Sequence, residues 1–173
     1  MDVVTTHPVV DAVLERYRDA LGGDMSAYGN HVYRCLNYHQ LLLGTQLPDF
    51  AVLAWVAHDL GIWTAGTFDY LTPSAELASA HAKEFGITEI DHLQRLITDH
   101  HRLRPVSDPL TETFRKADLV DVSRGLLRGH IGWSDVHAVV AQLPYRGFHA
   151  FLANGLTRYA ARHPLHPFPM LHW

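Results

Sequence analysis

The chain lacks several features that mark other classes of protein. It has a single cysteine, Cys35, among 173 residues, which excludes an internal disulfide and fits a reducing compartment. Its apolar stretches are interrupted by histidine, aspartate or glycine well short of membrane-spanning length. The first residues, 1–8, have neither the basic nor the apolar segment of a secretion signal. We therefore expect a cytoplasmic protein that has no membrane partner.

Cationic residues are also scarce. Lysine and arginine total 14 against 18 aspartates and glutamates, the formal net charge is −4, and no long basic stretch occurs. Binding of nucleic acid requires a concentrated cationic face, so nucleic acid is not an expected partner. With 47% apolar and 18% charged residues the chain is globular in composition. We expect one domain over 1–173, with a core of about 26–125 and C-terminal helices plus a tail rich in proline and histidine over 130–173.

Glycine, proline and capping residues divide the chain into helical segments. No segment alternates apolar and polar residues for long enough to predict a strand. The pattern predicts an all-α fold of seven to eight helices. These are expected at 8–21, 26–43, 48–60, 73–85, 88–101, 108–128, 134–143 and 147–162, with a loop at 62–72. The tail that follows is expected to pack on the surface.

A histidine–aspartate pair, His58-Asp59, ends an otherwise apolar helical stretch. A charged aspartate there is costly to desolvate unless a cation pairs with it. His31 lies on the apolar stripe of the preceding predicted helix, and Asp118 lies beside the stripe of a later one. Taken singly, an inward histidine is usually a satisfied core residue and a lone aspartate is often a cap. Together, the four residues predict a site for Zn²⁺, Mn²⁺, Fe²⁺ or Ni²⁺, because the set is too rich in nitrogen for Ca²⁺ or Mg²⁺.

In this order and helical context, the four residues resemble the signature of the HD superfamily: a histidine, then His-Asp, then a distant aspartate. The resemblance covers roughly residues 26–125 and includes Ala117-Asp118. It implies an HD-domain helical bundle with His31, His58, Asp59 and Asp118 as metal ligands, and Asp59 and Asp118 as catalytic residues. Most members of the superfamily hydrolyse phosphate esters or nucleotides, which implies a metal-dependent phosphohydrolase.

Further histidines could hold a second ion. Some HD families place two extra histidines between the His-Asp pair and the last aspartate, and His81 with His100 or His101 could fill those places here. Asp59 would then bridge two metals. The alternative for His81 is a partly exposed helix residue, whereas His100 shares the inward stripe of Leu93 and Ile97. One ion or two are both open.

The sequence offers candidates for substrate binding. Arg104 and Arg115 fall near the expected site and could clamp an anionic group. The alternative is that each arginine makes a structural ion pair. Tyr28 and Asp69, which is followed by Tyr70, could line the mouth of the site, although ordinary loop packing explains them equally well. These residues favour a small anionic substrate.

One position departs from the HD phosphohydrolases. Some of them carry a glutamate or lysine one turn after His-Asp, where this chain has Ile62, which cannot transfer a proton. Asp118, or Asp69 or Asp121, would have to accept the proton from water. Two other functions therefore stay open: a dinuclear-iron HD oxygenase acting on a small anionic or polyol substrate, and a hydro-lyase resembling cyanamide hydratase. A non-enzymatic HD domain that only binds a ligand is a further alternative.

The oligomeric state is also open. Aromatic residues such as Trp133 and Trp173 could contribute to the interface of a homodimer.

Overall fold

The fold is built entirely from helices. The computed structural model describes residues 2–172, and no strand forms among them; an isolated bridge joins Arg102 and His172. Eight helices have nine residues or more: α1 (Pro8–Arg16), α3 (Met25–Leu43), α4 (Asp49–Ala57), α6 (Leu71–Ala82), α7 (Ile90–Asp99), α8 (Pro109–Val122), α9 (Trp133–Gln142) and α10 (Phe148–Arg162). Shorter turns are α2 (Arg18–Leu21), η1 (Gly22–Asp24), α5 (Gly61–Thr64) and η2 (Lys83–Phe85). The all-α prediction is confirmed.

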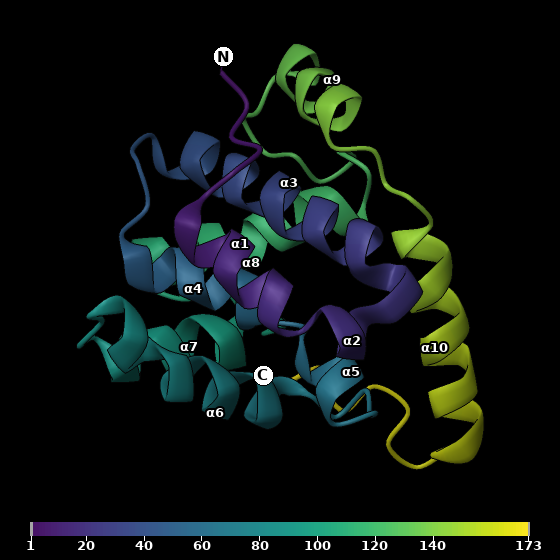
Figure 1. Cartoon of the computed structure of the whole chain (residues 1–173). Helices are drawn as coiled ribbons and strands as arrows, with labels where there is room; N and C mark the ends of the chain where they lie inside the picture. Colours follow the sequence, from purple (N-terminus) through teal and green to yellow (C-terminus); the bar gives the residue numbers. More distant parts are fainter. Residues whose placement is uncertain (1, 173) are drawn as a thin grey trace.

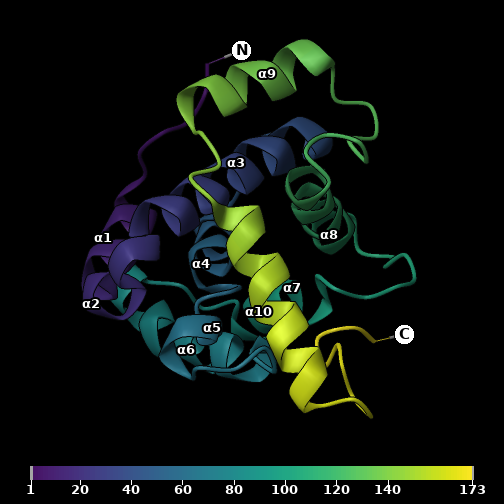
Figure 2. The ribbon, with the colours of Figure 1, turned by 90° about the vertical axis from the view of Figure 1, so that its right-hand side faces the viewer.

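Helix α4 is the centre of the molecule. Every residue from Ala51 to Ala57 is buried, so this helix is apolar on all sides rather than on one stripe. Helices α1, α3, α6 and α7 pack around it, as the views in Figure 1 and Figure 2 show. The turn that follows Ala57 therefore delivers His58 and Asp59 directly into the interior.

Two predicted helix boundaries are found where local chemistry places them. Gly44 closes α3 in the left-handed conformation. Asp108 caps α8, since its side chain accepts a hydrogen bond from the backbone N–H of Thr111, and Pro109 occupies the first turn. Both caps matter for the site, because α3 carries His31 and α8 carries Asp118.

Other boundaries were predicted wrongly. The expected helix 108–128 ends at Val122, because Arg124 and Gly125 have φ angles of 53° and 85°. The expected helix 8–21 is divided at Tyr17 into α1 and α2. The expected loop 62–72 includes most of α5, and α6 already begins at Leu71.

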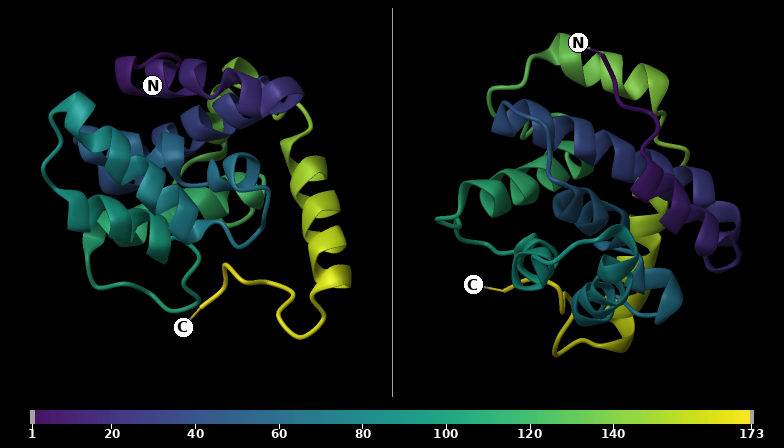
Figure 3. Two further views of the ribbon diagram at one scale, coloured as in Figure 1. Left: turned by 60° about the horizontal axis from the view of Figure 1, so that its bottom comes forward. Right: turned by 60° about the vertical axis from the view of Figure 1, so that its left-hand side comes forward.

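The C-terminal segment returns to the end of α7. Helix α10 lies against one side of the bundle. From the end of this helix, the C-terminal segment (residues 163–172) turns back beneath the molecule (Figure 3). The backbone N–H of Leu103 donates to the carbonyl of His172 at 2.9 Å. Met170 is buried rather than lying on the surface, so the expected surface tail is wrong for this part. No helix in residues 2–172 has the length and apolar character to cross a membrane.

Candidate metal centre

The predicted ligands meet at one buried point. His31 comes from the first half of α3, His58 and Asp59 from the turn after α4, and Asp118 from the last turns of α8. Their residues are at most 4% exposed. The Nε2 atoms of His31 and His58 lie 3.1 Å apart. Asp59 Oδ2 is 3.6 Å and Asp118 Oδ1 is 3.7 Å from the same His31 nitrogen.

The other ring nitrogen of each histidine fixes its tautomer. Nδ1 of His58 lies 2.7 Å from the carbonyl of Trp55, which can only accept a hydrogen bond, so Nδ1 carries the proton. Nδ1 of His31 lies 2.7 Å from Asp121 Oδ2, a carboxylate that likewise accepts. The neutral rings therefore point two Nε2 lone pairs at each other across 3.1 Å. This repulsive arrangement is relieved by a cation between them or by an added proton.

The spacing of the donor atoms fits a shared ion. Nitrogen and oxygen ligands bonded to one transition metal at about 2.0–2.2 Å lie about 3–3.6 Å apart. The His31–His58 nitrogens, at 3.1 Å, and the His58 Nε2–Asp59 Oδ2 pair, at 3.3 Å, fall in this range. The donor set of imidazoles and carboxylates suits Zn²⁺, Mn²⁺, Fe²⁺ or Ni²⁺. The residues present therefore fit a divalent transition metal.

The two carboxylates respond differently to their surroundings. Burial opposes ionisation of Asp59, but the neighbouring His58, with His100 and His31 close by, outweighs burial and holds the pKa of Asp59 well below the usual value. For Asp118 burial prevails over the nearby histidines and raises the pKa. Two buried carboxylates side by side cannot both ionise cheaply. A divalent cation would remove this conflict by balancing both charges.

His100 supplies a further inward nitrogen. It follows α7, and its Nδ1 donates to the carbonyl of Ile97 at 2.6 Å, so the Nε2 lone pair faces the site. This Nε2 and Asp59 Oδ1 are buried without a hydrogen-bond partner, and they lie 3.6 Å apart. Two acceptors that face each other without a donor are costly in a protein interior. They form, with His58, a second group of donor atoms close enough for one ion.

His101 lies at the open side of the cluster. Its Nε2 is 2.8 Å from the Tyr70 hydroxyl and its Nδ1 is 4.0 Å from Asp118 Oδ2. A hydroxyl donates or accepts, so Tyr70 accommodates either tautomer of His101. Burial is the main cause that lowers the pKa of His101 well below its usual value, and the neighbouring His100 lowers it further. His101 is therefore neutral, and it groups with His100 and Asp118 as potential ligands.

Behind His31 lies a buried ion pair. Arg34 donates to both oxygens of Asp121, at 2.5 and 2.8 Å, and both side chains are fully buried. Burial would raise the pKa of Asp121, but the hydrogen bonds from Arg34 and His31 outweigh it and lower the pKa to about 2. Asp121 stays ionised and orients His31. From the sequence, Asp121 was predicted only as a possible proton acceptor, and Arg34 was not identified.

Four other predicted residues are not brought into the metal cluster. The prediction of His81 as a ligand is not supported, because its ring nitrogens contact the Tyr17 hydroxyl at 2.8 Å and Arg16 at 2.7 Å. Arg115 pairs with Glu112 at 2.8 Å, which is the structural alternative. Arg104 and Asp69 are exposed.

Tyr28 is buried beneath the site rather than at its mouth. Its hydroxyl donates to the carbonyl of Val56 at 2.9 Å, and its ring packs near those of His31 and His58. It therefore positions the turn that carries the His-Asp pair.

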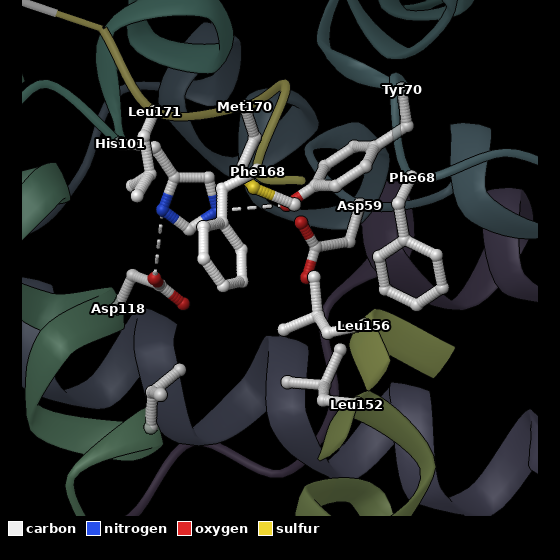
Figure 4. Close-up of a pocket in the computed structure, with 11 residues that line it drawn as sticks. Asp59, Phe68, Tyr70, His101, Asp118, Leu152, Leu156, Phe168, Met170 and Leu171 are labelled. Carbon is white, nitrogen blue, oxygen red and sulfur yellow. Dashed lines mark hydrogen bonds and ion pairs between the residues drawn. The ribbon is translucent and has the colours of Figure 1, made fainter. Parts of the chain in front are cut away.

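A cavity of about 170 Å³ opens next to the cluster. Asp59, Tyr70, His101 and Asp118 form its polar end (Figure 4). The rest of its wall is apolar and comes mainly from α10 and the C-terminal segment: Phe68, Val122, Leu152, Leu156, Phe168, Met170 and Leu171. Among the described residues that line it, none is a lysine or an arginine.

This apolar wall was missed from the sequence. Phe148, Leu152 and Leu156 recur at four-residue spacing and mark an inward face of α10. The sequence did not show which other element that face would meet. The apolar residues of the C-terminal segment, interleaved with proline and histidine, were the remaining signal.

Comparison of the chain with protein-family models, with curated proteins and with solved structures gave no match.

Proposed function

We propose that the protein is a metal-dependent hydrolase of the HD type. One observation carries the proposal: His31, His58 and His100 turn Nε2 lone pairs towards Asp59 and Asp118 in a buried space. Such a concentration of acceptors is stable only with a cation or added protons. The ion would be held by His31, His58, Asp59 and Asp118.

The side chains around the site support addition of water to a bound substrate. When bound, a divalent transition metal lowers the pKa of water and polarises an oxygen of the substrate. Asp118 lies at the polar end of the cavity, where a carboxylate oxygen that is not bound to the ion could accept a proton. Tyr70 and His101 are linked by a hydrogen bond at the same end and can orient a polar substrate group. A hydro-lyase would use these same residues.

The cavity narrows the range of substrates that a hydrolase of this kind would accept. Pockets for ligands the size of a drug or nucleotide usually measure about 300–1,000 Å³, against about 170 Å³ here. Ile62 lies in an apolar cluster with Tyr70 and Met170, so no acid–base residue occupies that position. The volume favours a molecule smaller than a nucleotide, and Ile62 disfavours a mechanism that needs an acid–base residue at that position.

A dinuclear oxygenase is the second candidate. The observation that favours it is the unpartnered pair of His100 Nε2 and Asp59 Oδ1, which lies beside the first group of ligands and could hold a second ion. Asp59 would then be a ligand of both ions. Two irons per chain, with an electron paramagnetic resonance signal after anaerobic purification, would favour the oxygenase over the hydrolase.

Metal content tests the proposed site directly. We expect the wild-type chain to retain a transition metal through gel filtration, and Asp59→Ala to lose it, measured by mass spectrometry of the elements in each sample. Asp69→Ala is the matched control, because Asp69 is exposed and its residue type is the same. Retention of the metal by Asp59→Ala, with circular dichroism showing a folded chain, would refute the site assignment.

A further inference from the structure

The wall of the cavity gives information about the substrate that the metal ligands do not. Leu152 and Leu156 from α10, together with Phe168 and Met170 from the C-terminal segment, form an apolar enclosure around the polar end. An apolar cavity of about 150 Å³ in a protein interior accommodates a molecule the size of benzene. The cavity here, at about 170 Å³, is of the same order.

One divalent ion would be enough to balance the negative charges of the carboxylates at the site. Asp59 and Asp118 are the charged residues among those lining the cavity, and one divalent cation would offset both. Asp121 is neutralised by Arg34. A phosphate or carboxylate would therefore enter an apolar enclosure next to two carboxylates, without an arginine or lysine among the described lining residues to pair with it.

We propose that the substrate is a compact, uncharged and largely apolar molecule with a single polar group that faces Asp59, Asp118, His101 and Tyr70. This inference rests on the proposed function, because a ligand of the cavity is a substrate only if the protein is an enzyme. It replaces the anionic substrate that was expected from Arg104 and Arg115. Arg115 is paired with Glu112, and neither arginine lines the cavity. Burial of the apolar part would supply the binding energy, and the polar end would supply orientation.

Three small probes test this proposal. Benzyl alcohol is compact and uncharged, phenyl phosphate carries the same ring with a charged group, and 2-naphthylmethanol carries the same alcohol on a fused two-ring system. Their binding to the zinc-loaded chain is measured by ligand-observed nuclear magnetic resonance. We expect benzyl alcohol to bind about tenfold or more tightly than the other two. Equal or tighter binding of either of the others would overturn the proposal.

Two leucines provide a matched pair of variants. Leu156→Trp places a larger side chain into the cavity and should weaken binding of benzyl alcohol about tenfold or more. Leu165→Trp makes the same change at a residue that is 99% exposed and should leave binding unchanged. Leu152→Phe repeats the cavity test if Leu156→Trp fails to fold, as judged by circular dichroism. Unchanged binding in a folded cavity variant would contradict the proposal.

The same measurements on the metal-free chain separate the two hypotheses. If no transition metal binds but benzyl alcohol still enters the cavity and is excluded by the cavity variants, the proposed function fails and the ligand class stands. If the metal binds and phenyl phosphate is preferred, the metal site stands and the inference about the substrate fails.

Discussion

The carboxylate of Asp121 contacts His31 on one side and Arg34 on the other, in a place that water does not reach. Such a carboxylate fixes the tautomer of its histidine and strengthens it as a metal ligand. It also balances a guanidinium that has no access to solvent. One side chain therefore links the stability of the helix pair α3 and α8 to the proposed metal site.

Asp121→Asn tests this link. We expect a loss of about 10–100-fold in metal affinity, because His31 loses its anionic partner, and a loss of about 3–5 kcal/mol in the free energy of unfolding, because Arg34 is left buried without a counter-ion. Competition titration with a chromophoric chelator, well below the melting temperature, measures the first effect, and urea denaturation measures the second. His81→Ala is the control, since His81 contacts Arg16 of α1 and Tyr17 rather than the cluster. Equal metal affinities in the two variants would contradict this role for Asp121.

Among single residues, the sequence correctly predicted those whose inward orientation follows from the apolar pattern of one helix. His31 lies on an apolar stripe, and His58-Asp59 follows a helix that is apolar all round, so both were expected to face inward. His81 also lies on a helical stripe, yet that side of α6 faces Tyr17 of the neighbouring turn. Helical periodicity defines which residues share a face, but the partner of that face is decided by tertiary packing.

Among the elements, the start of α5 approaches the start of α6 so closely that no side chain fits at Gly61. A Cβ atom added at Gly61 would lie 2.7 Å from the carbonyl oxygen of Tyr70 and 2.8 Å from the Ser74 hydroxyl. The backbone N–H of Gly61 also donates to that hydroxyl. The sequence suggested that this glycine ends a helix. The structure shows instead that it allows the start of α6, and with it Tyr70, to approach the site.

Gly61→Ala should therefore push the start of α6 away from α5. We expect a loss of about 1–3 kcal/mol in the free energy of unfolding, typical of inserting a methyl group into a packed interior, measured by chemical denaturation. Gly23→Ala is the matched control, because no atom lies within 4 Å of its added Cβ. If both alanine variants unfold at the same denaturant concentration as the wild type, the proposed constraint is wrong.

Helix boundaries could be predicted where a residue acts through its own chemistry. Gly44 and Asp108-Pro109 are such positions. The end of α8 could not, because Arg124 adopts a positive φ angle that its residue type does not favour. Contacts that α8 and its following turn make with the rest of the chain, such as the packing of Gly125 against Trp133, decide that boundary.

For the molecule as a whole, acid sensitivity has an identifiable source outside the site. His39 is buried, with Nδ1 accepting from the Trp55 indole at 3.0 Å and Nε2 facing the carbonyl of Leu110 at 3.2 Å. Burial lowers the pKa of His39 to about 3, whereas an unfolded histidine titrates near about 6.5. Between these values the unfolded chain binds a proton that the folded chain does not.

Folding stability should therefore be fully present above about pH 6.5 and fall as the pH is lowered towards 3, by up to about 1.4 kcal/mol per pH unit from His39. Urea denaturation of the metal-free chain at pH 7.5, 6 and 5 measures the slope. His39→Gln removes the titrating group and should flatten that slope, whatever its effect on stability at pH 7.5. Parallel pH profiles for the two chains would show that His39 does not contribute.

The cavity is a property of the whole molecule and was the least predictable part of the site. Its polar end comes from Asp59 and Asp118, which the sequence identified, and its apolar wall from residues such as Leu156 and Met170, which lie far along the chain. Nothing in local periodicity links the C-terminal segment to the turn after α4. Only the packing of α10 against the bundle brings them together.

The position of this wall in the chain has a consequence for synthesis. His31, His58, Asp59 and Asp118 leave the ribosomal tunnel before Phe168 and Met170, because these two wall residues follow Asp118 in the chain. The helices that carry the donor atoms can then assemble while the enclosure is still missing. An ion at the proposed site would therefore have its widest route to the donor atoms during synthesis, before the C-terminal segment covers them.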